Sequence, residues 1–262
     1  MPYLSRDGIS LYFERADGAR QPVVLIHGWC CDHSFLAPQF DHFAKLGHTV
    51  IAVDLRGHGR SDKPEQDYPI HGFSEDVAWM CQELDLQKPI LIGHSLGGIL
   101  AFDIAARWPD LPGAIAMLDA AIVFPPAARA AIPGIVERLR KPGYREDLRQ
   151  ILISVFFLPT DDAARRDALI KTMSTTPQHI MASAYAGLYD FDAEGARGRI
   201  HIPSLYIAAN EPSPRCDLTA LRDLLPGVLL GQTVGSGHFC QLEVPDQVNA
   251  MLDRFIALLP QA

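Results

Sequence analysis

The sequence predicts an α/β protein in which a mostly parallel central sheet carries helices on both faces. Short apolar runs rich in Val, Ile and Leu, which have the character of buried strands, alternate with segments whose apolar residues recur at helical spacing. This alternation is typical of parallel strands joined by crossover helices. A long interval without convincing strands adds a helical insertion, residues 122–199, to the sheet.

Six stretches have the composition of buried strands, and each is bounded by glycine, proline or charged residues. In chain order they cover residues 22–27, 48–54, 88–93, 113–119, 202–209 and 227–234. Helical spacing separates most of these stretches, as the apolar positions Phe73, Val77, Met80, Leu84, Val248, Leu252 and Phe255 illustrate. After the fourth strand of the whole chain, Asp54, Arg56 and His58 in "DLRGHGRSD" are expected to secure a turn.

The insertion consists of helix-like pieces interrupted by "FPP", "KPGY" and "LPTDD". Because it follows the carboxyl end of a strand, it should lie over the crevice in which open α/β sheets bind ligands. We therefore expect a single domain, residues 1–262, with a helical lid. Eight side chains of the lid would suit a hydrophobic or aromatic ligand, and we expect no more than a third of them to contact one: Phe124, Phe156, Phe157, Met173, Met181, Tyr185, Tyr189 and Phe191.

Composition narrows the class of partner. Lys and Arg total 23 against 31 Asp and Glu, and the net charge of -8 argues against nucleic acid, which is bound by clustered positive charge. No stretch reaches the roughly 20 apolar residues of a membrane helix, and the first ten residues contain no apolar run. We expect a cytoplasmic enzyme with reduced cysteines, a small-molecule substrate and no cofactor, while the oligomeric state, including a homo-oligomer, stays open.

The segment "ILIGHSLGGILAFDIAARWP" contains the most informative motif. A buried strand runs directly into Gly93-His94-Ser95-Leu96-Gly97 and then into an Ala-rich helix. This is the context of a nucleophile elbow, in which flanking glycines allow close packing and the serine hydroxyl stands at a helix N-terminus. We therefore predict that Ser95 is a nucleophile rather than a serine that only caps a helix.

A serine hydroxyl needs a base within hydrogen-bond reach. Among the ten histidines, His238 lies in a glycine-rich loop directly after the last predicted strand and before the last helix. A loop at the strand ends is where the catalytic base of such a sheet is expected. We therefore predict that His238 is the catalytic base that acts on Ser95, rather than an exposed loop histidine without a catalytic role.

Four motifs in order resemble the α/β-hydrolase fold superfamily over nearly the whole chain: "IHGW", "DLRGHGRSD", "GHSLGG" and "GSGHF" followed by "PDQV". The resemblance is specific for the fold and less so for the reaction, because this fold hosts many chemistries. It implies acyl transfer of the carboxylesterase type. It also implies that the oxyanion hole is formed by two backbone N–H groups, those of Leu96 and Trp29, with Cys30 as the alternative to Trp29.

The stretch "HGWCCDH" raises the question of a metal or redox site. Cys30 and Cys31 are adjacent, which does not match the two-to-four-residue spacing of zinc ligands, so we predict no metal here. Because the oxyanion donors are backbone groups, the side chains of Cys30 and His33 are free to shape a substrate pocket. We expect His27 to be a structural loop residue.

The acid that orients His238 is ambiguous. Most relatives carry an Asp after the strand at 202–209, where this chain has Asn210, Glu211 and Pro212. Asp119, at the end of the preceding strand, and Glu211 both preserve the order serine, acid, histidine. The acid fixes the imidazole tautomer and stabilises its positive charge, which depends more on placement than on residue type. We favour Asp119 and keep Glu211 as the alternative.

Two other functions stay open. "HGWCCDH", together with an Asp after the sixth strand, also resembles the cofactor-free dioxygenases that open 3-hydroxy-4-quinolone rings on this scaffold. That resemblance implies that His238 and Asp119 deprotonate the substrate, that Ser95 only donates a hydrogen bond, and that His33 lies beside the substrate. Leu96 departs from the histidine that some of those enzymes carry after the serine. A ligand receptor on the same fold would bind without turnover.

Overall fold

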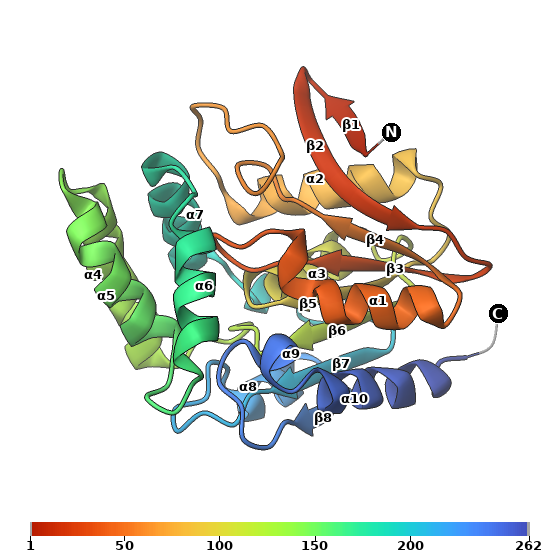
Figure 1. Ribbon diagram of the computed structural model, residues 1–262. Helices are drawn as coiled ribbons and strands as arrows, with labels where there is room; N and C mark the ends of the chain where they lie inside the picture. The colour runs from red at the N-terminus through yellow and green to blue at the C-terminus, as the bar shows by residue number, and fades with distance from the viewer. Residues whose placement is uncertain (1, 261–262) are drawn as a thin grey trace.

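An eight-stranded sheet forms the centre of the molecule in the computed structural model, which describes residues 2–260 (Figure 1). The strand order is β1-β2-β4-β3-β5-β6-β7-β8. From β4 through β8 in that order all neighbours are parallel, whereas β2 pairs with β1 and β4 in antiparallel orientation. The predicted mostly parallel sheet is therefore confirmed. The strands are β1 Tyr3–Arg6, β2 Ile9–Ala16, β3 Arg20–Ile26, β4 His48–Val53, β5 Ile90–His94, β6 Ala114–Leu118, β7 Ser204–Ala208 and β8 Leu229–Gln232.

The N-terminal hairpin is not among the six predicted strands. Its turn is Asp7-Gly8, with φ of 52° and 79°, and Asp-Gly is a strong signal for a two-residue hairpin turn. In β2 only the central segment 11–13 is buried. A fully buried strand is recognised by a longer continuous apolar run than this one. The Asp7-Gly8 turn is the signal from which the hairpin could have been predicted.

Helices cover both faces of the sheet. On one face Phe43 of α1 and Leu252 of α10 pack on the strands. On the other face Phe73 of α2 and Ile99 of α3 do so, and this buried cluster continues into the insertion. None of the helices in residues 2–260 combines the length and apolar character that crossing a bilayer requires. Outside the insertion the helices are α1 Ala37–Lys45, α2 Ile70–Glu83, α3 Leu96–Arg107, α8 Leu218–Leu224, α9 Cys240–Glu243 and α10 Pro245–Ala257, with a short 3₁₀ turn at His33–Leu36. A second 3₁₀ turn, Glu194–Ala196, lies at the end of the insertion.

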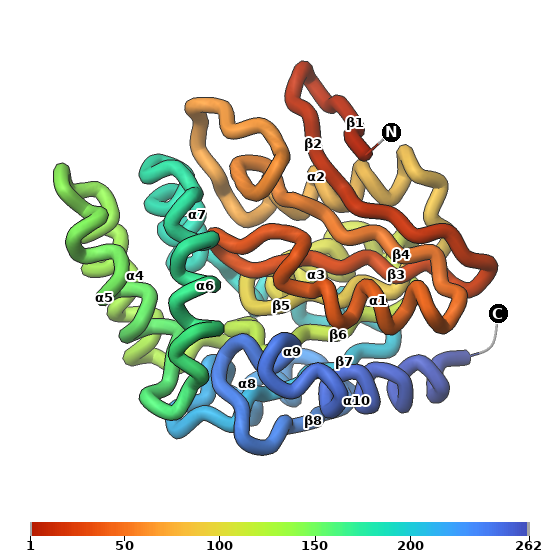
Figure 2. The backbone as a smooth tube through the Cα atoms, in the orientation of Figure 1, coloured from red at the N-terminus to blue at the C-terminus, as the bar shows by residue number. Residues whose placement is uncertain are grey.

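The segment between β6 and β7, predicted to lack strands, folds into four helices. They are α4 Pro126–Arg140, α5 Tyr144–Phe156, α6 Ala163–Met173 and α7 Gln178–Asp190. Figure 2 shows the chain leaving the sheet after β6, running through these helices at one end of the molecule, and returning to β7. We call residues 122–199 the helical insertion. Because the insertion begins directly after β6, it lies at the edge of the sheet where the parallel strands end.

Candidate active site

The turn between β5 and α3 holds Ser95 in a strained conformation. β5 ends at His94 and α3 begins at Leu96, so a single residue joins strand and helix. The φ and ψ of Ser95 are 54° and -118°, which residues with a Cβ rarely adopt. The N–H of Ser95 donates to the carbonyl of Leu118 at the end of β6, at 2.9 Å. This bond fixes the turn against the neighbouring strand.

Glycines on both sides of Ser95 allow the backbone segments to meet. A Cβ at Gly93 would collide with the carbonyl of Gly97, and a Cβ at Gly97 would collide with the carbonyl of Ile26 in β3. A Cβ at Gly28 would lie 3.2 Å from the Cβ of Ser95. The backbone of the loop after β3 therefore passes directly beside the serine.

His238 lies in the loop between β8 and α9, next to the elbow. Its Nδ1–H donates to Oδ2 of Asp119 at 2.7 Å. Its backbone carbonyl accepts a hydrogen bond from Nε2 of His94 at 2.8 Å, and the two imidazole centroids are 4.6 Å apart. Ser95 Oγ and His238 Nε2, both in the described part of the chain, are not hydrogen-bonded to each other. Catalytic hydrogen bonds of this kind often form only in the complex with substrate.

Three donors hold the carboxylate of Asp119, the first residue after β6. Oδ1 accepts a hydrogen bond from the N–H of Ala209 at 3.0 Å. Oδ2 accepts from Nε of Arg215 at 3.1 Å, in addition to the bond from His238. The carboxylate is therefore fixed in the position that an acid needs in order to orient the imidazole.

Glu211, the alternative acid, has a different partner. Its Oε1 accepts a hydrogen bond from Nη2 of Arg215 at 3.0 Å. The same guanidinium contacts Asp119, and its Nη2 also donates to the carbonyl of Val155 at 2.8 Å. Arg215 thus bridges two carboxylates. The structure brings His238 to Asp119, the acid that the sequence favours, and pairs Glu211 with Arg215.

The two residues whose backbone N–H groups are expected in the oxyanion hole belong to the segments that adjoin Ser95. Leu96 opens α3, where the first N–H groups of a helix have no intrahelical acceptor. Trp29 follows Gly28, whose backbone adjoins the serine. The indole Nε1–H of Trp29 donates to the carbonyl of Met181 in α7 at 3.0 Å, which ties this loop to the helical insertion.

Burial determines the resting charge of the histidine. It lowers the pKa of His238 well below the ordinary value, and the positive charge of Arg215 lowers it further. Burial raises the pKa of Asp119, whereas Arg215 and the N–H of Ala209 oppose that shift because they stabilise the ionised form. A neutral imidazole can accept the proton of a serine hydroxyl throughout the neutral pH range.

Comparison with known proteins identifies a family in which this arrangement of sheet, nucleophile elbow and histidine loop occurs. A family model described as the alpha/beta hydrolase fold matches residues 21–245. The chain belongs to the α/β-hydrolase fold family.

The relatives of this chain include hydrolases and esterases, and the chain is an enzyme of the α/β-hydrolase fold family. It is 25% identical to the AB hydrolase superfamily protein YisY of Bacillus subtilis, over 96% of this chain and 97% of that protein. It is 32% identical to the (E)-2-((N-methylformamido)methylene)succinate hydrolase of Acinetobacter baylyi, over 53% of this chain and 51% of that protein. The solved esterase EaEST from Exiguobacterium antarcticum shares the fold, with a TM-score of 0.85 and 21% identity over 96% of this chain and 97% of that chain.

A cavity of about 980 Å³ lies between the sheet and the helical insertion of this α/β-hydrolase. Trp29, Ser95, Leu96 and Asp119 line it from the strand ends, and apolar side chains of α4, α5 and α7 line it from the insertion. Small-molecule sites typically have volumes of about 300–1,000 Å³ and mostly apolar walls. The cavity therefore has the size and character of a site for a small hydrophobic molecule.

Half of the eight side chains singled out in the insertion line this cavity: Phe124, Phe156, Phe157 and Tyr185. The others pack elsewhere, since Met173, Met181 and Phe191 are buried in the core and Tyr189 is exposed. Phe156 also stacks on the ring of His238, with centroids 5.3 Å apart and an interplanar angle of 24°. The insertion thus contributes both the wall of the cavity and a cover for the histidine.

Neither Cys30 nor His33 lines the cavity that the described residues enclose, contrary to the expectation that they shape it. The backbone of Cys30 has a φ of 57°, and its side chain is buried in the core, where burial raises the pKa of the thiol well above its ordinary value. His33 instead contacts Asp54, with 2.8 Å between Nδ1 and Oδ1. Within residues 2–260, His, Cys, Asp and Glu side chains form no group of three arranged to hold a metal ion.

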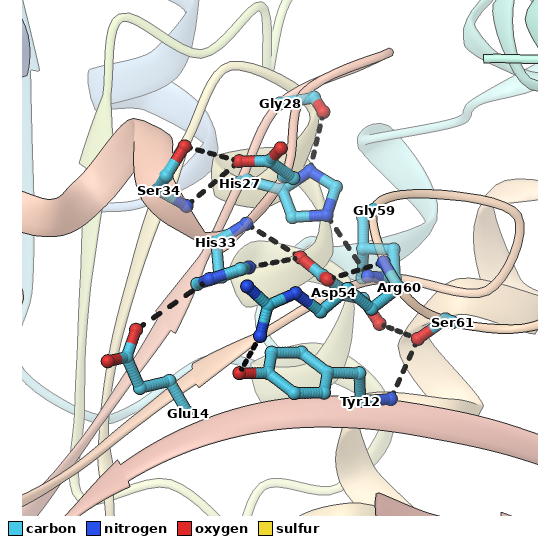
Figure 3. A network of polar contacts seen from close by, with 12 residues as sticks. Tyr12, Glu14, His27, Gly28, His33, Ser34, Asp54, Gly59, Arg60 and Ser61 are labelled. Carbon is cyan, nitrogen blue, oxygen red and sulfur yellow. Dashed lines mark hydrogen bonds and ion pairs between the residues drawn. The ribbon is translucent and has the colours of Figure 1, made fainter. Parts of the chain in front are cut away.

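Asp54 secures the turn after β4, as its motif predicts (Figure 3). Its carboxylate accepts hydrogen bonds from the N–H groups of His33 and Arg60, each at 2.7 Å. His27 has the structural role expected for it, because its Nδ1 contacts the carbonyl of Gly28 and its Nε2 accepts from the N–H of Leu55. The histidines of this loop therefore position the backbone that leads to Trp29.

The contact between His33 and Asp54 predicts a pH-dependent stability. The hydrogen bond that His33 donates to Asp54 raises the pKa of His33, and the nearby Glu14 carboxylate adds to the shift. Since the folded pKa exceeds the unfolded value of about 6.5, the stabilisation is complete below that pH and is lost as pH rises through the folded pKa. We expect His33→Gln to lower Tm more at about pH 5.5 than at about pH 8.5. Thermal unfolding followed by circular dichroism measures this, and equal losses at the two pH values would contradict it.

Two positioning residues, His94 and Arg215, were not found from the sequence. His94 is the variable residue of the G-x-S-x-G pattern, and only its place before Ser95 gives a signal. Arg215 lies in an irregular loop after β7, where a charged residue is usually solvated. Its side chain is only 18% exposed because two carboxylates and a carbonyl surround the guanidinium.

Proposed function

We propose that this α/β-hydrolase cleaves a small hydrophobic or aromatic ester through an acyl-enzyme on Ser95. The observation that carries the proposal is the 2.7 Å contact between His238 and Asp119 beside a strained serine, with Ser95 and Asp119 lining one apolar cavity. The compared proteins named as a hydrolase and an esterase also support a hydrolytic reaction.

Each residue has a defined step in this mechanism. Nε2 of His238 accepts the hydroxyl proton while Oγ of Ser95 forms a bond to the ester carbonyl carbon. The N–H groups of Trp29 and Leu96 donate to the developing oxyanion, an interaction worth about 3 kcal/mol per donor. The proton then passes to the departing alkoxide. His238 next deprotonates a water molecule whose oxygen bonds to the acyl carbon, and the proton returns to Oγ of Ser95 as the bond between Oγ and the acyl group breaks. Asp119 holds Nδ1 protonated and stabilises the imidazolium.

The direct test uses p-nitrophenyl esters of increasing acyl length and a fluorophosphonate probe. We expect ester turnover and a covalent adduct that peptide mass spectrometry assigns to Ser95, because only an activated serine reacts with such a probe. The rate of labelling should fall in the presence of a competing ester. An adduct on another residue, or turnover without an adduct, would contradict the assignment of the nucleophile.

The pairing of His238 with an acid after the sixth strand supports a second candidate, a cofactor-free ring-cleaving dioxygenase of a 3-hydroxy-4-quinolone. In that reaction the histidine removes the substrate hydroxyl proton and the carbanion reacts with oxygen, while Ser95 only donates a hydrogen bond. The contact of His33 with Asp54, away from the cavity, removes one feature that favoured this function. Oxygen uptake with a hydroxyquinolone, absent without substrate, would establish it in place of ester hydrolysis.

A further inference from the structure

The charged side chains that line the cavity are unequal in number. Arg215 is the only basic side chain among the described residues that line it, whereas Asp119, Glu211 and Asp217 are acidic. Asp217 caps α8 by accepting hydrogen bonds from the N–H groups of Thr219 and Ala220. One of these carboxylates, that of Asp119, also contacts His238.

The guanidinium of Arg215 already contacts two carboxylates of the protein. Its Nε–H contacts Asp119 at 3.1 Å, and its Nη2 group contacts Glu211 at 3.0 Å. The two carboxylate side chains are 4% and 8% exposed, so water screens these charges weakly. A carboxylate on a substrate would have to compete with Glu211 for the guanidinium while facing two negative charges around it.

Glu211 is not required by the histidine, because Asp119 already contacts it. A buried ion pair contributes little net stability, since desolvation of both charges offsets their attraction. Its effect on the electrostatic potential inside a low-dielectric cavity is larger. We therefore look for the role of Glu211 in the effect of its negative charge on ligands inside the cavity.

We propose that Glu211 occupies the Nη2 group of Arg215, adds a negative charge beyond the one that Asp119 already supplies, and thereby excludes carboxylate-bearing substrates, so that this site takes esters with an uncharged acyl group. This inference rests on the proposed ester hydrolysis and adds a specificity-determining residue to it. Loss of the Glu211 charge leaves one carboxylate against one guanidinium, and the arginine then becomes available to an anionic acyl chain.

The kinetic test compares p-nitrophenyl hexanoate with mono-p-nitrophenyl adipate, which carries a terminal carboxylate in place of a methyl group. We expect the natural enzyme to prefer the hexanoate. In Glu211→Gln the ratio of kcat/KM for adipate over hexanoate should rise about tenfold or more, chiefly through a lower KM for the adipate. Because both esters are measured on the same preparation, any loss of folded enzyme cancels in the ratio.

Two further variants define the outcome. Glu146→Gln removes an exposed carboxylate in the first turn of α5, outside the cavity, and should leave the ratio unchanged. Arg215→Gln removes the cation and should shift the ratio further against the adipate. A proportional change for both esters in Glu211→Gln, or an equal rise of the ratio in Glu146→Gln, would overturn the proposal.

Binding measurements on variants without the serine nucleophile test this inference independently of the proposed ester hydrolysis. Calorimetry can measure hexanamide and adipamate, which are a neutral and an anionic amide, on Ser95→Ala and on Ser95→Ala/Glu211→Gln. A selective gain of affinity for adipamate in the double variant supports the inference even if no ester is hydrolysed. Absence of that gain overturns it, even if the natural enzyme proves to be an esterase.

Discussion

Replacing Ser95 by alanine is expected to lower the kcat for hydrolysis of p-nitrophenyl hexanoate by roughly four to six orders of magnitude. The change removes the only atom that bonds to the acyl carbon and leaves the oxyanion donors and the cavity in place. It also relieves none of the backbone strain, because alanine keeps the Cβ at a φ of 54°. Steady-state kinetics measure the loss, and circular dichroism checks that the variant is folded.

The histidine provides the control for this result. His238→Ala should cost about as much as Ser95→Ala, and the double variant should lose little more, because the two residues act as one unit in the same step. Independent, multiplicative losses would indicate that they do not cooperate. If Ser95→Ala only slows turnover of a hydroxyquinolone and leaves oxygen uptake intact, the dioxygenase reaction replaces the esterase.

Asp119→Asn is expected to lower kcat by about 10⁴-fold with a much smaller effect on KM. The amide that replaces the carboxylate can no longer stabilise the imidazolium, and its NH₂ group favours the wrong tautomer of His238. The N–H of Ala209 should still donate to the amide oxygen, whereas the hydrogen bond from Arg215 is lost because the NH₂ group takes the place of Oδ2. Circular dichroism checks that the variant is folded. Kinetics on p-nitrophenyl hexanoate measure the effect.

The comparison with Glu211 decides which residue is the acid. Glu211→Gln should reduce hexanoate hydrolysis by less than about tenfold, because its carboxylate contacts Arg215 and not the imidazole. A loss in this variant that exceeds the loss in Asp119→Asn would assign the acid to Glu211. It would also require a rearrangement of Arg215 during the reaction.

Local patterns account for the parts of the molecule that could be predicted from the sequence. The buried strands and the elbow depend on short runs of residues in fixed order, so Ser95 and its glycines are recognisable without a structure. The choice between Asp119 and Glu211 depends on how two neighbouring strands end in space. The partner of His33 depends on a turn that brings Asp54 to it across 21 residues, and a linear pattern does not report such a contact.

The hydrogen bond from the indole of Trp29 to α7 has a mechanical consequence. In the proposed mechanism Trp29 donates its backbone N–H to the oxyanion while its indole binds α7 of the helical insertion, and Phe156 of α5 stacks on His238. A ligand that displaced α5 or α7 on entering the cavity would therefore also move Phe156 away from His238 or break the indole hydrogen bond of Trp29. In the proposed mechanism the entry of a ligand and the arrangement of the catalytic groups would thus be linked through these two residues.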